Sequence, residues 1–127
     1  MSIFTTNEIE YLGSGLLGRL ATVGSDGIPH VAPVGMISYN PHLDTVDIRG
    51  HDLTNTKKFR DIARSGRAAL VVDDLASTKP WRPRGIEVRG NAEVIEKPEP
   101  VIRIHPQRFV TWGIDTGGFG HNSRSVG

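Results

Sequence analysis

The sequence predicts a mainly β protein, an antiparallel barrel decorated by two short helices. Six or more strand-sized runs of alternating or continuous apolar residues are separated by turn signals, whereas only two segments carry a helical period. Closure into a barrel removes the exposed edges that so many short strands would otherwise leave. A twisted sandwich is the alternative arrangement of the same strands.

Length and composition are those of one domain, and we expect residues 1–127 to form it. The 127 residues carry 15 Lys and Arg against 14 Asp and Glu, so the formal net charge is only +1. This balance, with 6% aromatic residues, argues against nucleic acid as a partner. The sequence contains no cysteine and shows neither a signal peptide nor a membrane span, so we expect a cytoplasmic protein that does not bind membranes.

The first half of the chain predicts a helix followed by four strands. Thr5 and Glu8 have the spacing of a capping box, so a short amphipathic helix begins at this point. An Asp-Gly turn at 26–27 supplies the positive φ that a tight hairpin needs. The extended runs separated by turn residues are 19–23, 29–34, 36–39 and 45–48.

The second half begins with another helix, Thr56–Ser65, which Gly66 ends. Prolines predict an irregular loop or lid over 74–84, because they remove backbone donors and restrict their neighbours. A bulge or a barrel corner is expected at Gly90, and the glycine-rich tail 113–127 is expected to be mobile. Strand-sized runs lie at 68–72, 86–95, 101–105 and 108–112.

The start of the second helix is a candidate anion site. Lys57, Lys58 and Arg60 lie in its first turn, where the helix dipole is already positive. Free amides at this end, together with the hydroxyls of Thr54 and Thr56, are suited to a phosphate or carboxylate. The alternative is a solvated face whose long side chains reach water.

Other candidate residues give weaker signals. The five histidines lack the spacing of a metal site, although His51 follows a strand end close to the basic helix start. No serine has the context of a nucleophile, so we expect neither a catalytic side chain nor a metal. Trp81, with Arg82 and Arg84, could stack on a planar ligand or cover one end of a barrel.

Several motifs follow one another in order along the chain: LATV at 20–23, DGIPHVAPV at 26–34, TKKFRDI at 56–62, RAALVVD at 67–73 and RGIEVRGNA at 84–92. This ordered set resembles the pyridoxamine 5'-phosphate oxidase-like split-barrel family over about residues 8–112. More narrowly, it resembles the actinobacterial branch of that family that binds the deazaflavin coenzyme F420.

The resemblance implies a six-stranded antiparallel split β-barrel with two or three short helices, assembled as a homodimer. A flavin or deazaflavin would lie at the dimer interface, with its phosphate at the start of the second helix and its ring along the second strand. Trp81 is expected to cover this ring. The candidate cofactor-binding residues are Val31, Pro33, Val34, Ile48, Gly50, His51, Thr56, Lys57, Lys58, Arg60 and Trp81.

The expected activity is hydride transfer between F420 and an unidentified small organic acceptor. Such chemistry requires positioning of ring and acceptor more than a protein nucleophile. The chain lacks the C-terminal substrate segment of the pyridoxine-biosynthesis oxidases, so pyridoxamine phosphate oxidation is not expected. FMN on the same scaffold, in a flavin reductase, an oxidase or an FMN-binding protein, is the alternative. The cations Lys57, Arg82 and Arg84 favour F420 because its tail is anionic.

Overall fold

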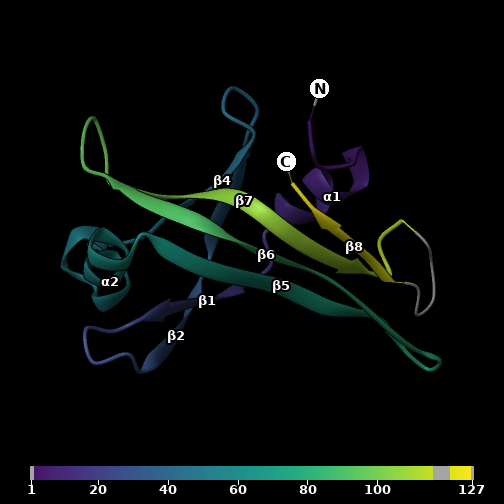
Figure 1. The fold of residues 1–127 in the computed structure, drawn as a ribbon. Coiled ribbons are helices and arrows are strands. Elements are labelled where there is room, and N and C mark those ends of the chain that lie inside the picture. The colour runs from purple at the N-terminus through teal and green to yellow at the C-terminus, as the bar shows by residue number, and fades with distance from the viewer. Residues whose placement is uncertain (1, 116–120, 127) are drawn as a thin grey trace.

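The computed structural model describes residues 2–115 and 121–126. Within them, one antiparallel sheet of eight strands is accompanied by two α-helices and a short 3₁₀ helix (Figure 1). The helices are α1 (Thr6–Leu12), η1 (Leu53–Asn55) and α2 (Lys57–Ser65). The strands are β1 (Gly18–Val23), β2 (Pro29–Val34), β3 (Met36–Asn40), β4 (Thr45–Arg49), β5 (Arg67–Thr78), β6 (Trp81–Ile95), β7 (Val101–Trp112) and β8 (His121–Ser125). The mainly β split-barrel prediction is confirmed, with eight strands in place of six.

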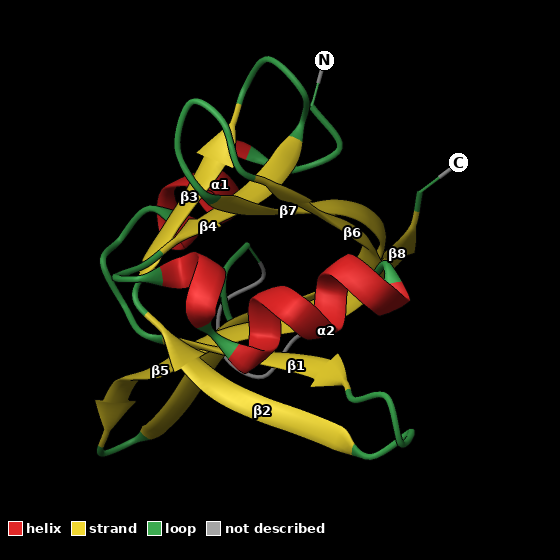
Figure 2. Cartoon of the chain, turned by 90° about the vertical axis from the view of Figure 1, so that its left-hand side faces the viewer, coloured by secondary structure: helices red, strands yellow, loops and turns green. Residues whose placement is uncertain are grey.

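The strand order forces the sheet to curl. The strands are arranged β2-β1-β5-β6-β7-β4-β3, and β8 pairs with β7. Although β2 and β3 lie at opposite ends of this order, only Gly35 separates them in the sequence. A flat sheet of this width could not bring its two ends within one residue, so the sheet bends into a barrel that stays open between β2 and β3. Figure 2 shows α2 lying between the two halves of this curled sheet.

A single core fills the barrel. Alternate residues of β1 and β5 are buried, as the two-residue period of a strand requires, and α2 adds Phe59 and Ile62 from one face. On the other side of the barrel from α2, α1 adds Tyr11 and Leu12 (Figure 1). The largest fully buried apolar side chains are Phe109, Leu20, Ile48, Leu53, Ile62, Leu70, Ile86, Ile102 and Ile104.

The two helices begin as the sequence predicts. In α1 the Glu8 amide donates to Thr5 Oγ1 at 3.1 Å, and the Thr5 amide donates to Glu8 Oε1 at 2.8 Å, which completes the capping box. Thr56 caps α2 by accepting a hydrogen bond from the Phe59 amide, and Gly66 ends the helix with a φ of 70°.

Residues 74–84 form a paired hairpin of β5 and β6, and the prediction of an irregular loop is wrong. Pro80 lies in the turn. Pro83 precedes Gly85, the residue at which β6 begins to pair with β7. The missing N–H of either proline therefore does not interrupt the hydrogen bonds between β6 and β7. The hairpin projects away from α2 (Figure 1).

Strand β7 is continuous, although the sequence predicts two strands on either side of residues 105–107. Its Pro106 pairs with Gly90, next to the shift in register between Arg89 and Gly90, so the bulge predicted at Gly90 is confirmed. A Cβ on Gly90 would lie 2.0 Å from the His105 carbonyl oxygen, so only glycine fits this approach. Pro106 lies between the part of β7 that pairs with β4 and the part that pairs with β8, so β6 is its one paired neighbour in the described chain.

The C-terminal segment is more ordered than the predicted mobile tail. Residues 121–125 form β8, and residues 116–120 and 127 lie outside the described part of the chain. Arg124 anchors β8, because its guanidinium donates to the buried Glu8 carboxylate and lies 4.0 Å from the ring centroid of Phe109.

Candidate functional site

The N-terminal end of α2 presents two unused main-chain donors. Thr56 Oγ1 accepts a hydrogen bond from the Phe59 amide at 3.3 Å, and the Arg60 amide donates to the Thr56 carbonyl at 3.3 Å. The amides of Lys57 and Lys58 have no acceptor among the residues that the structure describes. Free amides at a helix N-terminus bind anions, because the dipole of the helix adds to their partial charge.

One of the three cations at this end is partly neutralised. Lys57 Nζ lies 3.2 Å from Oδ2 of the buried Asp61, which also accepts a hydrogen bond from the Thr22 hydroxyl at 3.1 Å. Burial raises the pKa of Asp61, but the hydrogen bonds from Lys57 and Thr22 outweigh it and hold the pKa below its usual value. Asp61 is therefore ionised at neutral pH and keeps Lys57 beside the β1–β2 turn.

The other two cations are not balanced by any carboxylate within the described ranges. Lys58 is half-buried and makes no ion pair, while Arg60 Nη1 donates only to the Asn55 carbonyl at 3.0 Å. Two charged side chains and two free amides thus surround one helix end. This donor set fits the phosphate of a flavin or deazaflavin.

The residues expected to line the cofactor ring divide into two groups. On β2, Val31 is 65% exposed and Pro33 is also exposed, so their side chains can contact a ligand. Val34 and Ile48 are buried in the core, at 5% and 0% exposed, so the structure leaves neither residue accessible to a ring. The chain leaves β4 through the exposed Gly50 and His51 and reaches Thr56 by way of η1, which places this corner next to the α2 end.

Trp81 does not join this cluster within one chain. It lies at the tip of the β5–β6 hairpin, 57% exposed, and that hairpin points away from α2 (Figure 1). Arg84 is also removed from the predicted cluster, since it forms an ion pair with Asp74 at 2.7 Å. A contact between Trp81 and a cofactor at α2 would have to come from the hairpin of a second copy.

Sequence reasoning missed a hollow of about 300 Å³ on the outer face of the sheet. Ala21 and Ala69 pair with each other across β1 and β5, and Arg67 and Arg89 are exposed at the sides. The hollow could have been found only from the strand register, because small residues far apart in the sequence form its floor. Its remaining lining residues are Thr22, Val23, Pro29, Ala68, Gly90 and Gln107.

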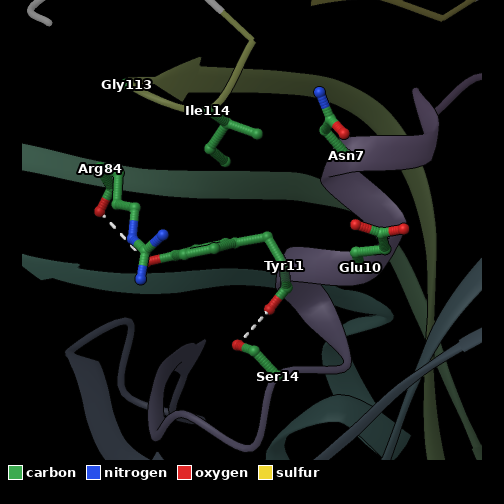
Figure 3. Close-up of a pocket in the computed structure, with 7 residues that line it drawn as sticks. All are labelled: Asn7, Glu10, Tyr11, Ser14, Arg84, Gly113 and Ile114. Carbon is green, nitrogen blue, oxygen red and sulfur yellow. Dashed lines mark hydrogen bonds between the residues drawn. The ribbon is translucent and has the colours of Figure 1, made fainter. Parts of the chain in front are cut away.

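A second missed feature is a cavity of about 350 Å³ beside α1 (Figure 3). Tyr11 donates a hydrogen bond to Asp74 Oδ1 at 2.7 Å, and the Arg84 guanidinium binds both oxygens of the same carboxylate. The hydrogen bonds from Arg84 hold the pKa of Asp74 below its usual value, whereas burial raises the pKa of Tyr11 well above its own. Tyr11 and Arg84 are too far apart in the sequence for any motif to join them.

The described residues contain neither a cluster of metal-ligating side chains nor a long apolar helix. No group of three or more His, Cys, Asp and Glu side chains in residues 2–115 and 121–126 could hold a metal ion. No helix in these ranges is long and apolar enough to cross a membrane.

Comparison with known proteins assigns the family. Residues 9–113 match the model of the pyridoxamine 5'-phosphate oxidase family. The chain belongs to this family. A 5a,11a-dehydrotetracycline/5a,11a-dehydrooxytetracycline reductase from Streptomyces rimosus is 40% identical to it over 121 residues, which cover 88% of this chain and 84% of the relative.

Solved structures of low sequence identity share the split-barrel fold. A conserved hypothetical protein from Mycobacterium tuberculosis superposes with a TM-score of 0.72 at 21% identity, covering 99% of this chain and 94% of that one. An F420 reductase superposes with a TM-score of 0.62 at 24% identity, covering 79% of this chain and 93% of that one. At these identities the likeness shows the fold alone.

Proposed function

We propose that this chain is an oxidoreductase that binds coenzyme F420 at the N-terminal end of α2 and serves hydride transfer to a small organic acceptor. The observation that carries the proposal is the helix end at which Lys58, Arg60 and two free amides have no anionic partner in the described chain. The 40% identity to a reductase over most of both chains supports the reaction class.

The chain's own residues would bind the cofactor and orient its ring. Lys58, Arg60 and the free amides would hold the cofactor phosphate, while the exposed faces of Val31 and Pro33 would support its ring. When bound, F420 supplies the hydride chemistry itself, so no protein nucleophile is needed. The name of the Streptomyces relative makes a dehydrotetracycline the first acceptor to assay.

FMN on the same scaffold is the second candidate, because its single phosphate would also satisfy Lys58 and Arg60. Of the cations assigned to the F420 tail, Lys57 and Arg84 are paired with carboxylates in the structure. Arg82 is exposed and has no partner among the described residues, but it lies on the hairpin that points away from α2. It would therefore favour the anionic tail only from a second copy. A direct comparison of the two cofactors decides between them.

We also propose that the cofactor site is completed in a homodimer. The face of the sheet around Val31, which is 65% exposed, and Val23, which is 40% exposed, is apolar and adjoins the hollow over Ala21 and Ala69. A second copy would cover this surface. Sedimentation at micromolar concentration should show a dimer that Val31→Glu weakens, whereas a monomer alone would contradict the proposal.

Fluorescence titration of the purified protein with F420 and FMN separately tests the cofactor. Each charge-assisted contact is worth roughly 1.5–3 kcal/mol, so Lys58→Ala and Arg60→Ala should each weaken affinity about tenfold to a hundredfold. Arg64→Ala is the matched control, because Arg64 lies in the last turn of the same helix and should leave affinity unchanged.

The outcomes separate the candidates. Tight F420 binding that depends on Lys58 and Arg60 supports the proposal, and binding of FMN alone with the same dependence supports the second candidate. Unchanged affinity in both variants would show that the α2 end is a solvated face and remove the site.

A further inference from the structure

The cavity beside α1 lies apart from every element proposed to hold the cofactor. Its lining comes from α1 and the turn after it, the start of β6 and the segment after β7, and no residue of β2, β4 or α2 takes part. Its volume of about 350 Å³ is in the range of small-molecule sites. The lining residues are Asn7, Glu10, Tyr11, Ser14, Arg84, Gly113 and Ile114.

One end of the cavity is a rigid, electrically neutral pair. Arg84 donates from Nε to Asp74 Oδ1 at 2.7 Å and from Nη2 to Oδ2 at 2.9 Å, and the Tyr11 hydroxyl donates to the same carboxylate. The guanidinium carbon also lies 5.3 Å from the centroid of the Tyr11 ring. Arg84 Nη1 has no acceptor in the described chain, so this end offers one fixed donor without net charge.

The other end carries an unbalanced negative charge. Glu10 is exposed on α1 and makes no ion pair or hydrogen bond with a described residue. Asn7 lies one turn before Glu10, and its side-chain N–H donates a hydrogen bond to Asp115 at 2.9 Å. The side-chain oxygen of Asn7 therefore remains available as an acceptor. Because Asp74 cancels the charge of Arg84, the cavity as a whole favours a cation, and favours it near Glu10.

Between these ends the cavity is lined by Tyr11 and Ile114. Ile114 lies across the cavity from the Tyr11 ring, with Asn7 and Glu10 toward the α1 end and Arg84 at the opposite end (Figure 3). The segment that carries Ile114 is held in place, because Asp115 accepts hydrogen bonds from Thr5 and Asn7 at 3.0 and 2.9 Å. Tyr11 is only 7% exposed, so Ile114 provides most of the apolar contact between the two polar ends.

We propose that this cavity binds a small organic cation, a protonated amine attached to a ring that carries an oxygen. The amine lies beside Glu10 and Asn7, the ring lies against Ile114, and the oxygen accepts a hydrogen bond from Arg84. Neither the site nor its test depends on a cofactor at α2.

Three probes of similar size test the charge and the ring together by NMR titration of the cofactor-free protein at millimolar concentration. Tyramine has the ring, the oxygen and the amine, 4-ethylphenol lacks the charge, and 3-(4-hydroxyphenyl)propionate reverses it. Tyramine should bind about fivefold more tightly than 4-ethylphenol, the effect of one partly exposed ion pair. The propionate should bind most weakly of the three.

Variants connect the preference to the cavity. Glu10→Gln should remove the advantage of tyramine over 4-ethylphenol, while Glu96→Gln, an exposed carboxylate in the turn after β6, should leave it intact. Arg84→Lys should weaken both probes alike, because both use the ring oxygen. Absence of tyramine binding, an equal response in Glu10→Gln and the wild type, or tighter binding of the propionate would each overturn the proposal.

Discussion

The two α-helices of this protein start in opposite ways. At the start of α1, Thr5 is joined by two carboxylates, those of Glu8 within the capping box and of Asp115 from the segment after β7. At the start of α2, Thr56 is followed by Lys57 and Lys58, and the first turn contains no acid. The chain thus supplies its own anions at one helix end, and at the other the proposed cofactor would supply one.

The difference has an energetic meaning. A cation at a helix N-terminus costs about 0.3–1 kcal/mol, and a carboxylate there gains about as much. A sequence under pressure for stability alone would place acids at both ends, as it does at α1. The proposed cofactor would offset the cost of Lys58 and Arg60 in the first turn of α2.

The largest expected effect is at α1. Glu8→Ala removes a carboxylate that is 0% exposed and that accepts from the Thr5 amide and the Arg124 guanidinium. Breaking a buried pair leaves its partner uncompensated, so the free energy of unfolding should fall by about 3 kcal/mol. Urea denaturation measures the change, and β8 should lose protection from hydrogen exchange at the same time.

Glu10→Ala is the matched control for that experiment. Glu10 lies on the same helix but is exposed and unpaired in the described chain, so its loss should change stability by less than about 0.5 kcal/mol. Equal losses for the two variants would show that the capping box does not set the stability of this end.

The next effect concerns the segment that closes the α1 side. Gly113 has a φ of 67°, and a Cβ there would lie 2.3 Å from the Pro83 carbonyl oxygen. Gly113→Ala should cost about 2 kcal/mol, because backbone strain and a steric clash add. Gly15→Ala, at a φ of 85° with no atom within 4 Å, bears the strain alone and should cost about 1 kcal/mol. Equal losses of stability in the two variants would mean that Pro83 and Arg84 of β6 shift to make room for the new Cβ at no cost.

Local signals account for what the sequence predicted correctly. The capping box of Thr5 and Glu8, the turn at 26–27, the cap at Thr56 and the stop at Gly66 are all read within a few residues, and each lies where it was expected. The bulge at Gly90 was also local, because a glycine interrupts an alternating run.

Long-range pairing accounts for what it missed. The residues at 74–84 form strands because β5 pairs with residues 81–91 of β6, which overrides the local effect of two prolines. Asp74 and Arg84 face each other only in that register, so the cavity beside α1 and the neutralisation of Arg84 could not be predicted from spacing. The cations at the start of α2 were predictable because they lie within one turn of helix.

Asp61→Asn tests the charge balance at the start of α2. The variant weakens the bonds to Lys57 and Thr22, so the free energy of unfolding should fall by about 1 kcal/mol at pH 7. The folded state holds the pKa of Asp61 below its usual value, so this stabilisation is present above about pH 4 and is lost as the pH falls through the folded pKa. Urea denaturation at pH 7 and pH 3 should therefore show the gap between wild type and variant closing in acid. A gap of the same size at both pH values would assign the effect to packing.

The smallest effect distinguishes the two helix ends most directly. Lys58→Glu gives α2 the acidic first turn that α1 already has, so the cofactor-free protein should gain about 0.5 kcal/mol, or roughly 2 °C in melting temperature. Cofactor affinity should fall below that of Lys58→Ala, because the new carboxylate repels the phosphate. Lys97→Glu, an exposed position in the turn after β6, makes the same change of charge away from any helix and should alter neither quantity. A loss of stability in Lys58→Glu would show that Lys58 already has a partner in the fold, and the contrast between the two helices would then carry no argument for a ligand.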